Sequence, residues 1–463
     1  MAVALPSPVG RQSDVIYLAP TGHTVVLGTA GTGKTLMAIL RAAYLAQATT
    51  PGHGPTLLVT YNNMLVTYLK HLKPDLATEV TVETYGRFAR GYLNARGKMP
   101  SFGGIADKNP LFNLVQQAVS TVAAGVSSKF LGRDTRFFLD ELAWIAGMGI
   151  HTLDQYLVVD RVGRSVGLPK DLRALMWQVR DAYLVARIAR GYLYDWNDIA
   201  TAVRVELAAD PTPRRYRHVV IDEGQDLSPE AIRSLVEAVP PGGSVSFFGD
   251  FVQQIYGQGI SWRSSGLVVP HGVKRFRDNY RNSAEVARVA IAMTAMENLK
   301  LDEDDLVEPV APTAAGPQPV VVACADNKVQ LDLVRQLAQQ LSRSKSVAVL
   351  ARTWPLVNTA VAGLTTLSLE SNRWVDGPGI YAGTYHSAKG LEFGAVILPY
   401  CDADNLPLDY VVDAFGEDEA AARDARLLYV AVTRPQAELI ITHTGTRTAL
   451  LPTAPGLFLE QTR

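Results

Sequence analysis

Short aliphatic and β-branched runs recur along the chain, and each is followed by turn residues and then by apolar residues at helical spacing. Strands that are buried on both faces are continuously apolar, so this alternation predicts parallel sheets with crossover helices. Eight strands are expected in two groups: His23–Leu27, Thr56–Tyr61, His218–Ile221 and Ser244–Phe248, then Pro319–Cys324, Ser346–Leu350, Ala395–Pro399 and Glu438–Thr442. The two groups predict an α/β fold with two domains.

Residues 94–200 differ from the rest, because apolar residues recur there at three- and four-residue spacing, as in FFLDELAWIAGMGI. This spacing predicts an all-helical insert in the first α/β domain. The expected domains are therefore residues 1–93 with 201–270, the insert 94–200, and residues 271–463. The stretch Leu301–Gln318 combines acidic residues with Pro, Ala and Gly, which favours an exposed connection.

Composition narrows the class of protein. The 463 residues are 48% hydrophobic and 19% charged with a formal net charge of -1, as in ordinary globular proteins, so a polyanion would be bound only by local groups in a cleft. Cys324 and Cys401 lack metal-ligand spacing, and the chain shows neither signal-peptide features nor an apolar run of about 18 residues. We therefore expect a cytoplasmic protein without a disulfide framework, a zinc or iron–sulfur centre, or a membrane partner.

The first expected strand runs directly into the sequence GTAGTGKT, and a helical pattern follows it. This is the G-x-x-x-x-G-K-[ST] pattern in the strand–loop–helix context that phosphate binding requires. Glycines let backbone N–H groups converge on phosphate oxygens, Lys34 can reach the β- and γ-phosphates, and the Thr35 hydroxyl can bind Mg²⁺. We call these eight residues the phosphate loop: Gly28, Thr29, Ala30, Gly31, Thr32, Gly33, Lys34 and Thr35.

An acidic pair follows the expected strand that ends at Ile221. Nucleotide hydrolysis needs an acidic group for the metal and a base for the attacking water, both at the end of a neighbouring strand. Asp222 is the candidate for holding Mg²⁺ through its water shell, and Glu223 is the candidate base. An Asp-Glu pair alone is more often a turn or a helix cap, but beside the phosphate loop it is the expected partner.

The identity of the nucleotide is tested by the segment Asn327-Lys328-Val329-Gln330. It is the nearest match to the N-K-x-D element that reads guanine, and it lacks the aspartate whose carboxylate would pair with the base. A GTPase of that type is therefore disfavoured, and a small-molecule kinase leaves the second α/β domain unexplained.

Five more motifs follow the phosphate loop in order: DEGQD, FFGDFVQQIY, DNYRNS, TYHSAKGLEF and RLLYVAVTR. Together they resemble superfamily 1 helicases of the UvrD/Rep/PcrA type, over nearly the whole chain from Gln12 to Thr442. The resemblance implies two RecA-like P-loop domains that hydrolyse ATP with Mg²⁺ between them and step along single-stranded DNA, 3′ to 5′. RNA is an alternative substrate, and a repair or defence complex is a candidate partner.

The same resemblance implies contacts to ATP by groups that read the adenine, the ribose or the γ-phosphate. They are Gln12 and Tyr280 at the adenine, Glu392 at the ribose, and Gln253, Arg281 and Arg434 at the γ-phosphate. A guanidinium suits the last task because it stays charged and binds phosphate oxygens bidentately as charge develops.

A track for the nucleic-acid strand is implied as well, because aromatic faces stack on bases of any sequence. Its members are Thr60, Tyr61, Thr84, Tyr85, Tyr256 and His386. For Tyr61 and Tyr85 the alternative is an ordinary place in a hydrophobic core.

Several positions depart from the family pattern. Gln258 stands where a base-stacking Trp is common, Thr84 and Tyr85 are followed by Gly86-Arg87 rather than by a histidine, and Leu36 replaces a usual Arg. The span from Trp354 to Thr384 is short, whereas large family members insert a whole domain there.

This compact form leaves a second function open. It is a nucleic-acid-stimulated ATPase that acts as a switch or loader without unwinding. A third possible function is a module that binds a nucleotide without hydrolysing it. The intact pair Asp222 and Glu223 argues against this function.

Overall fold

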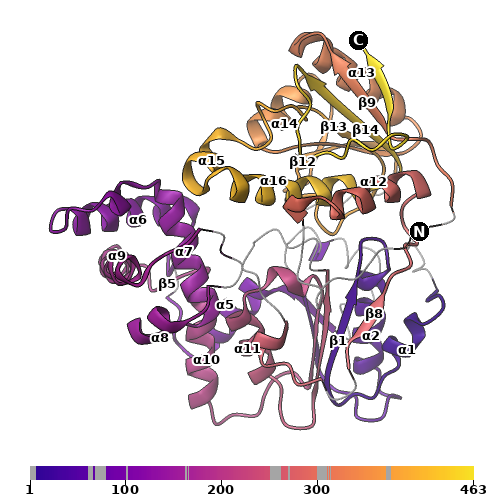
Figure 1. Cartoon of the computed structure of the whole chain (residues 1–463). Helices are drawn as coiled ribbons and strands as arrows, with labels where there is room; N and C mark the ends of the chain where they lie inside the picture. The colour runs from indigo at the N-terminus through magenta and orange to yellow at the C-terminus, as the bar shows by residue number, and fades with distance from the viewer. Residues whose placement is uncertain are drawn as a thin grey trace.

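The computed structural model describes residues 7–60, 66–67, 80–100, 103–161, 164, 166–250, 262–269, 272–299, 310, 312, 314–371 and 377–463. It has two α/β domains, one above the other, with a group of helices beside the first (Figure 1). The predicted connection Leu301–Gln318 lies mostly outside these residues. In the described part of the chain, every helix is too short or too polar to cross a membrane.

The first domain is built on a six-stranded parallel sheet with the strand order β3-β2-β6-β7-β1-β8. Its strands are β1 (Gly22–Gly28), β2 (Thr56–Thr60), β3 (Val80–Thr84), β6 (His218–Ile221), β7 (Ser244–Gly249) and β8 (Lys274–Phe276). The expected boundary at residue 270 is wrong in detail, because β8 pairs with β1 and so extends the first sheet.

Helices cover both faces of this sheet. They are α1 (Gln12–Ile16), α2 (Lys34–Ala46), α5 (Tyr85–Ala95), α10 (Ile199–Ala209) and α11 (Pro229–Glu237). Successive strand residues point to opposite faces, so Val25 and Leu27 pack with α5, α10 and α11, whereas Val26 packs with α1 and α2. Both faces are apolar, which explains why the sequence shows continuous rather than alternating hydrophobic runs.

The insert has its own core, with Trp144 and Tyr156 fully buried. Its helices are α6 (Lys108–Ala123), α7 (Thr135–Met148), α8 (Leu153–Val158) and α9 (Lys170–Ala189). The prediction that it is all-helical needs one correction, because β4 (Ile105–Ala106) and β5 (Tyr194–Asp195) form a short parallel ladder. This ladder ties together the two ends of the insert where they leave the first domain.

The second domain carries a seven-stranded parallel sheet with the order β11-β12-β10-β13-β14-β9-β15. Its strands are β9 (Val320–Cys324), β10 (Ser346–Ala351), β11 (Leu367–Ser368), β12 (Gly379–Thr384), β13 (Phe393–Leu398), β14 (Pro435–Thr444) and β15 (Leu459–Thr462). The predicted α/β class with two parallel sheets is thereby confirmed.

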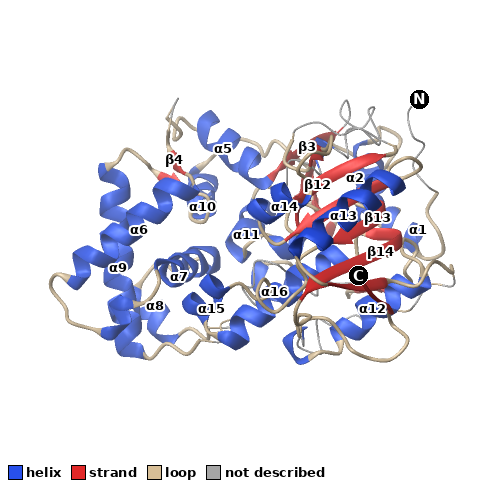
Figure 2. Cartoon of the chain, turned by 90° about the horizontal axis from the view of Figure 1, so that it is seen from above, coloured by secondary structure: helices blue, strands red, loops and turns tan. Residues whose placement is uncertain are grey.

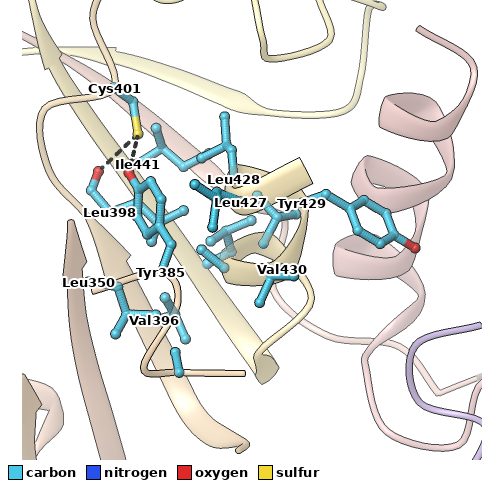
Figure 3. Packing of buried hydrophobic residues seen from close by; sticks show 14 of the residues in the cluster. Leu350, Tyr385, Val396, Leu398, Cys401, Leu427, Leu428, Tyr429, Val430 and Ile441 are labelled. Atoms are coloured by element: carbon cyan, nitrogen blue, oxygen red, sulfur yellow. Dashed lines mark hydrogen bonds between the residues drawn. The ribbon is translucent and has the colours of Figure 1, made fainter. Parts of the chain in front are cut away.

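Helices also cover both faces of the second sheet, as the view from above shows (Figure 2). They are α12 (Ala284–Thr294), α13 (Asn327–Leu341), α14 (Trp354–Ala360), α15 (Asp409–Phe415) and α16 (Glu417–Val432). Between the sheet and α16 lies a dense core, in which the Tyr385 hydroxyl is 3.9 Å from Cys401 Sγ (Figure 3). Cys401 Sγ lies 3.6 Å from the carbonyl oxygen of Leu398. Packing of Tyr385 fixes the loop that continues to His386.

Candidate active site

The phosphate loop connects the carboxyl end of β1 to the first turn of α2. Gly31 and Gly33 have φ angles of 80° and 81°, a left-handed conformation in which a side chain would be strained. The Lys34 ammonium group donates to the carbonyl oxygens of Gly28 at 2.9 Å and Thr29 at 2.7 Å. Burial lowers the pKa of Lys34, although Asp250, 3.6 Å away, acts in the opposite direction. The loop thus holds a buried cation among converging backbone groups.

Gly31 is also the point where a distant segment meets the loop. Its carbonyl oxygen accepts a hydrogen bond from the Tyr280 N–H at 2.8 Å. A Cβ atom at Gly31 would lie 2.0 Å from Asn279 Oδ1 and 3.1 Å from Arg281 Cβ. Only glycine permits this approach, which brings Tyr280 and Arg281 to the phosphate loop.

Gln12 packs against the other side of the loop. Its side-chain amide donates to the carbonyl oxygen of Thr32 at 3.1 Å, and its oxygen accepts from the Val9 N–H at 3.0 Å. The side chain is buried, so the structure places Gln12 beside the nucleotide loop. Its contact with adenine remains a prediction.

Asp222 follows β6 directly and is buried. Burial and then the neighbouring charge of Glu223 raise the pKa of Asp222 to about 7, while a hydrogen bond with the Thr35 side chain lowers it. Among the described residues, its Oδ2 atom has no hydrogen-bond partner although water cannot reach it. Such an atom is costly unless a cation satisfies it, so Asp222 and Thr35 fit a Mg²⁺ ion.

Glu223 has a φ angle of 54°, which is unusual for a residue with a side chain and is a form of strain that gathers at functional sites. Its Oε2 atom accepts a hydrogen bond of 2.6 Å from the Gln225 amide, whose own oxygen accepts from the Asp250 N–H at 3.0 Å. Burial raises the pKa of Glu223, but Lys389, Lys34 and Arg434 lower it more, and the net shift is downward. The carboxylate is therefore ionised and able to accept a proton.

The second domain contributes three cations to the same place. Arg281 Nε pairs with Glu392 Oε2 at 2.8 Å, and Lys389 Nζ pairs with Asp226 Oδ2 of the first domain at 2.7 Å. Arg434 donates to the carbonyl oxygens of Val430 at 2.9 Å and Leu391 at 3.2 Å, and to Thr433 Oγ1 at 3.0 Å.

Arg434 is fully buried, and its burial together with nearby Arg281 lowers the pKa of Arg434 to about 10. Tyr280 is 55% exposed beside the loop, so its side chain is accessible to a nucleotide base. Two α/β domains thus supply one site with groups of complementary charge.

Sequence reasoning missed Gln225, Asp226, Asp250 and Lys389. Each of these residues lies inside one of the ordered motifs. No spacing rule, however, predicts that Lys389 forms an ion pair with Asp226 of the other domain. The predicted γ-phosphate sensor Gln253 lies outside the described residues. Glu392, predicted at the ribose, is paired with Arg281, and its contact with ATP remains a prediction.

Among the described residues predicted to contact the nucleic-acid strand, Thr60, Thr84, Tyr85 and His386 lie at or just after the carboxyl ends of parallel β-strands. Thr60 ends β2 with a buried hydroxyl that has no partner in the described part of the chain, and Thr84 caps α5 by accepting from the Arg87 N–H at 3.4 Å. His386 follows β12, and burial, with Arg352, Lys108 and Lys389, lowers the pKa of His386 to about 3. Tyr61 and Tyr256 lie outside the described residues.

Tyr85 does not fit its predicted role. The residue is 8% exposed and packs in the core between the first sheet and α5, and its hydroxyl lies 2.8 Å from Ser234 Oγ. Stacking on a base would require the ring to leave this core. The structure therefore supports the alternative, a packing role.

We expect Tyr85→Ala to lower the stability of the first domain by about 3–5 kcal/mol, because a large aromatic cavity would remain. Tyr85→Phe should cost only about 1 kcal/mol, since Ser234 still donates to the Ala231 carbonyl oxygen at 2.7 Å. Urea denaturation checks both, with Tyr17→Ala as a control at a tyrosine that is 59% exposed. If Tyr85→Ala bound oligonucleotides more weakly while its urea denaturation was unchanged, Tyr85 would contact the nucleic-acid strand after all.

Sequence comparisons agree with this geometry. The family described as AAA domain matches residues 12–258, which is more than half of the chain, and the UvrD-like helicase C-terminal domain matches residues 358–446. The first match contains the phosphate loop and the acidic pair, and the second contains the loop of His386 and Lys389. The chain belongs to the UvrD-like helicases of superfamily 1, as the ordered motifs predicted.

Three curated relatives show how far the similarity extends. ATP-dependent DNA helicase UvrD1 of Mycobacterium tuberculosis (strain ATCC 25618 / H37Rv) is 26% identical over 269 residues, 54% of this chain and 33% of that protein. ATP-dependent DNA helicase srs2 of Schizosaccharomyces pombe is 23% identical over 322 residues, 62% of this chain and 35% of that protein. DNA helicase II of Rickettsia typhi is 33% identical over 81 residues, which are 17% of this chain and 12% of that protein. The chain thus matches about a third of the length of UvrD1 and srs2.

Proposed function

We propose that this protein is an ATP-driven motor that moves along single-stranded DNA, as a helicase or translocase. The observation that carries the proposal is that cations of the second domain lie close to charged groups of the first. Arg281 lies close enough to Lys34, and Arg434 and Lys389 close enough to Glu223, to shift the pKa of each. Hydrolysis in such a site depends on how the domains are placed, so it can be converted into domain motion. The relatives named ATP-dependent DNA helicases support both the nucleotide and the substrate.

In this proposal, Lys34 and the phosphate loop bind the phosphates of ATP, and Arg281 and Arg434 stabilise charge on the γ-phosphate. Thr35 and Asp222 hold Mg²⁺, which supplies charge neutralisation at the phosphates when it is bound. Glu223 orients and deprotonates the attacking water. Thr60, Thr84 and His386 bind the strand.

The proposal predicts that ATP hydrolysis rises by at least about tenfold when single-stranded DNA is added, because the strand selects the productive domain arrangement. Phosphate release measured with and without oligonucleotides of DNA and RNA tests this. Equal stimulation by RNA would widen the substrate class. No stimulation by either polymer would exclude a nucleic-acid motor.

A nucleic-acid-stimulated switch or loader is the second candidate, and the short span between α14 and β12 favours it. This span lacks room for the additional domain of large relatives. Strand-separation assays on duplexes with single-stranded 3′ or 5′ tails distinguish the two and test the proposed 3′ to 5′ direction. Stimulated hydrolysis without strand separation would favour the switch. A cytoplasmic location and a partner complex in repair or defence belong to either proposal.

A further inference from the structure

The insert helix α7 contacts both α/β domains. Near its C-terminal end, Arg233 of α11 donates to the Met148 carbonyl oxygen at 2.9 Å, which fixes α7 to the first domain. On its other side, Arg423 of α16 donates to both carboxylate oxygens of Asp140, at 3.2 Å and 2.7 Å. Figures 1 and 2 both show α7 beside α15. The insert therefore bridges the two domains away from the ATP site.

A second contact strengthens the bridge. The Arg136 guanidinium carbon lies 4.7 Å from the ring centroid of Tyr410 on α15, a cation–π geometry. We call Arg136, Asp140, Tyr410 and Arg423 the latch. Because α7 is fixed to the first domain, any change in the angle between the domains must break the latch or pull on the insert.

The latch is built to open at small cost. The side chains of Arg423 and Asp140 are 21% and 27% exposed, and partly exposed ion pairs contribute little stability. When they part, Asp140 keeps its ion pair with Arg164, and Arg423 keeps Glu419 at 2.7 Å and the Phe415 ring at 3.8 Å. No charge is left buried without a partner on either side.

The insert itself is rigid by contrast. Glu141, the neighbour of Asp140, is fully buried and accepts from Arg161 at 2.6 Å, Arg164 at 2.7 Å and the Tyr156 hydroxyl at 2.6 Å. Breaking this network would leave a buried charge unpaired, so it holds while the latch opens. The insert can therefore move as one body against the second domain.

The latch is also connected to the predicted strand site. Arg352 lies close enough to His386 to act on its ionisation, as does Lys108 of the insert. Arg352 Nε pairs with Asp424 at 2.8 Å, and Asp424 is the residue next to Arg423 on α16. A nucleic-acid strand whose phosphates reach Arg352 would compete with Asp424 for its guanidinium. Loss of the ion pair between Arg352 and Asp424 would then disturb α16 next to Arg423.

We propose that the latch is an autoinhibitory contact, which holds the two domains in an unproductive arrangement until a nucleic-acid strand releases Arg423 from Asp140. This inference rests on the proposed function, because it concerns the regulation of the same ATP site. Strand binding and hydrolysis are then linked through the insert, in addition to any direct contact between the strand and the ATP site.

Arg423→Gln tests the proposal. Its ATP hydrolysis without nucleic acid should rise about three- to tenfold, which corresponds to about 0.7–1.4 kcal/mol, while the rate with saturating oligonucleotide stays unchanged. The matched control is Arg447→Gln, because Arg447 is 20% exposed, pairs with Glu460 at 2.8 Å and lies 5.9 Å from the Phe458 ring within the second domain. Arg447→Gln should behave as the unmodified protein.

A second measurement does not depend on activity. Dyes attached at Ser120→Cys on α6 and Ser344→Cys after α13 report the distance between the insert and the second domain, since Cys324 and Cys401 are buried. Without nucleic acid, Arg423→Gln should broaden the distribution of distances between the two dyes. Oligonucleotide should have the same effect on the unmodified protein. An unchanged unstimulated rate or an unchanged dye distance in Arg423→Gln overturns the latch. If oligonucleotide does not stimulate ATP hydrolysis by the unmodified protein, the proposed motor function is wrong instead. The dye distances of Arg423→Gln then test the latch by themselves.

Discussion

Replacing Glu223 with glutamine is expected to lower the rate of ATP hydrolysis by about 100- to 10,000-fold, the range for loss of a general base. Glutamine keeps the volume of the side chain but cannot take a proton from water. The carboxylate suits this task because three cations and the Gln225 amide keep the pKa of Glu223 low despite burial. Affinity for ATP should change little, since Lys34 and the phosphate loop remain intact.

Steady-state phosphate release together with binding of a fluorescent ATP analogue measures the two effects separately. Glu237→Gln is the control, because Glu237 is the last residue of α11, its side chain is 38% exposed, and it pairs with Arg204 at 2.6 Å. It should hydrolyse ATP at the unmodified rate. If Glu223→Gln did the same, Glu223 would not be the base.

The sequence predicted the fold well where strands are continuously apolar. All eight predicted strands are present, with ends that differ by up to three residues. Three of the missed strands show how that pattern is lost: β3 alternates buried and half-buried residues, β8 has three partly exposed residues, and β12 contains two glycines. A short or mixed strand is stabilised by its neighbours in the sheet, which a local pattern does not record.

The active site divides in the same way. The phosphate loop is one contiguous segment, so its residues and their spacing are both visible in the sequence. The link from Gln225 to Asp250 joins segments that follow neighbouring strands of the first sheet, and the pair Lys389 and Asp226 joins the two domains. Only the tertiary structure brings these residues together. At Tyr85 the structure favours the alternative that the sequence left open, a place in the core, because a motif position does not reveal which way a helix turns its first aromatic side chain.

Arg281→Ala is expected to lower the turnover number for ATP hydrolysis by about 1,000-fold or more, as removal of an arginine that stabilises the transferring phosphoryl group does. Arg281 is a better test than Arg434, whose buried hydrogen bonds to Val430 and Leu391 also hold the second domain together. Arg281 is 18% exposed and bound through one ion pair, so its loss leaves the fold intact. Arg281→Lys should rescue little, because an ammonium group lacks the planar pair of donors.

The controls for Arg281 separate charge from position. Arg288→Gln removes an arginine that is 54% exposed and paired with Glu285 on α12 of the same domain, and it should leave hydrolysis unchanged. Glu392→Gln removes the ion-pair partner of Arg281 but leaves the guanidinium itself in the protein, so much of the rate should remain. If Arg281→Ala raised the KM for ATP while the turnover number stayed constant, Arg281 would bind the ground state and the transition state equally. Hydrolysis would then not depend on this group of the second domain, and the coupling between ATP and domain motion would have to pass through Arg434 and Lys389.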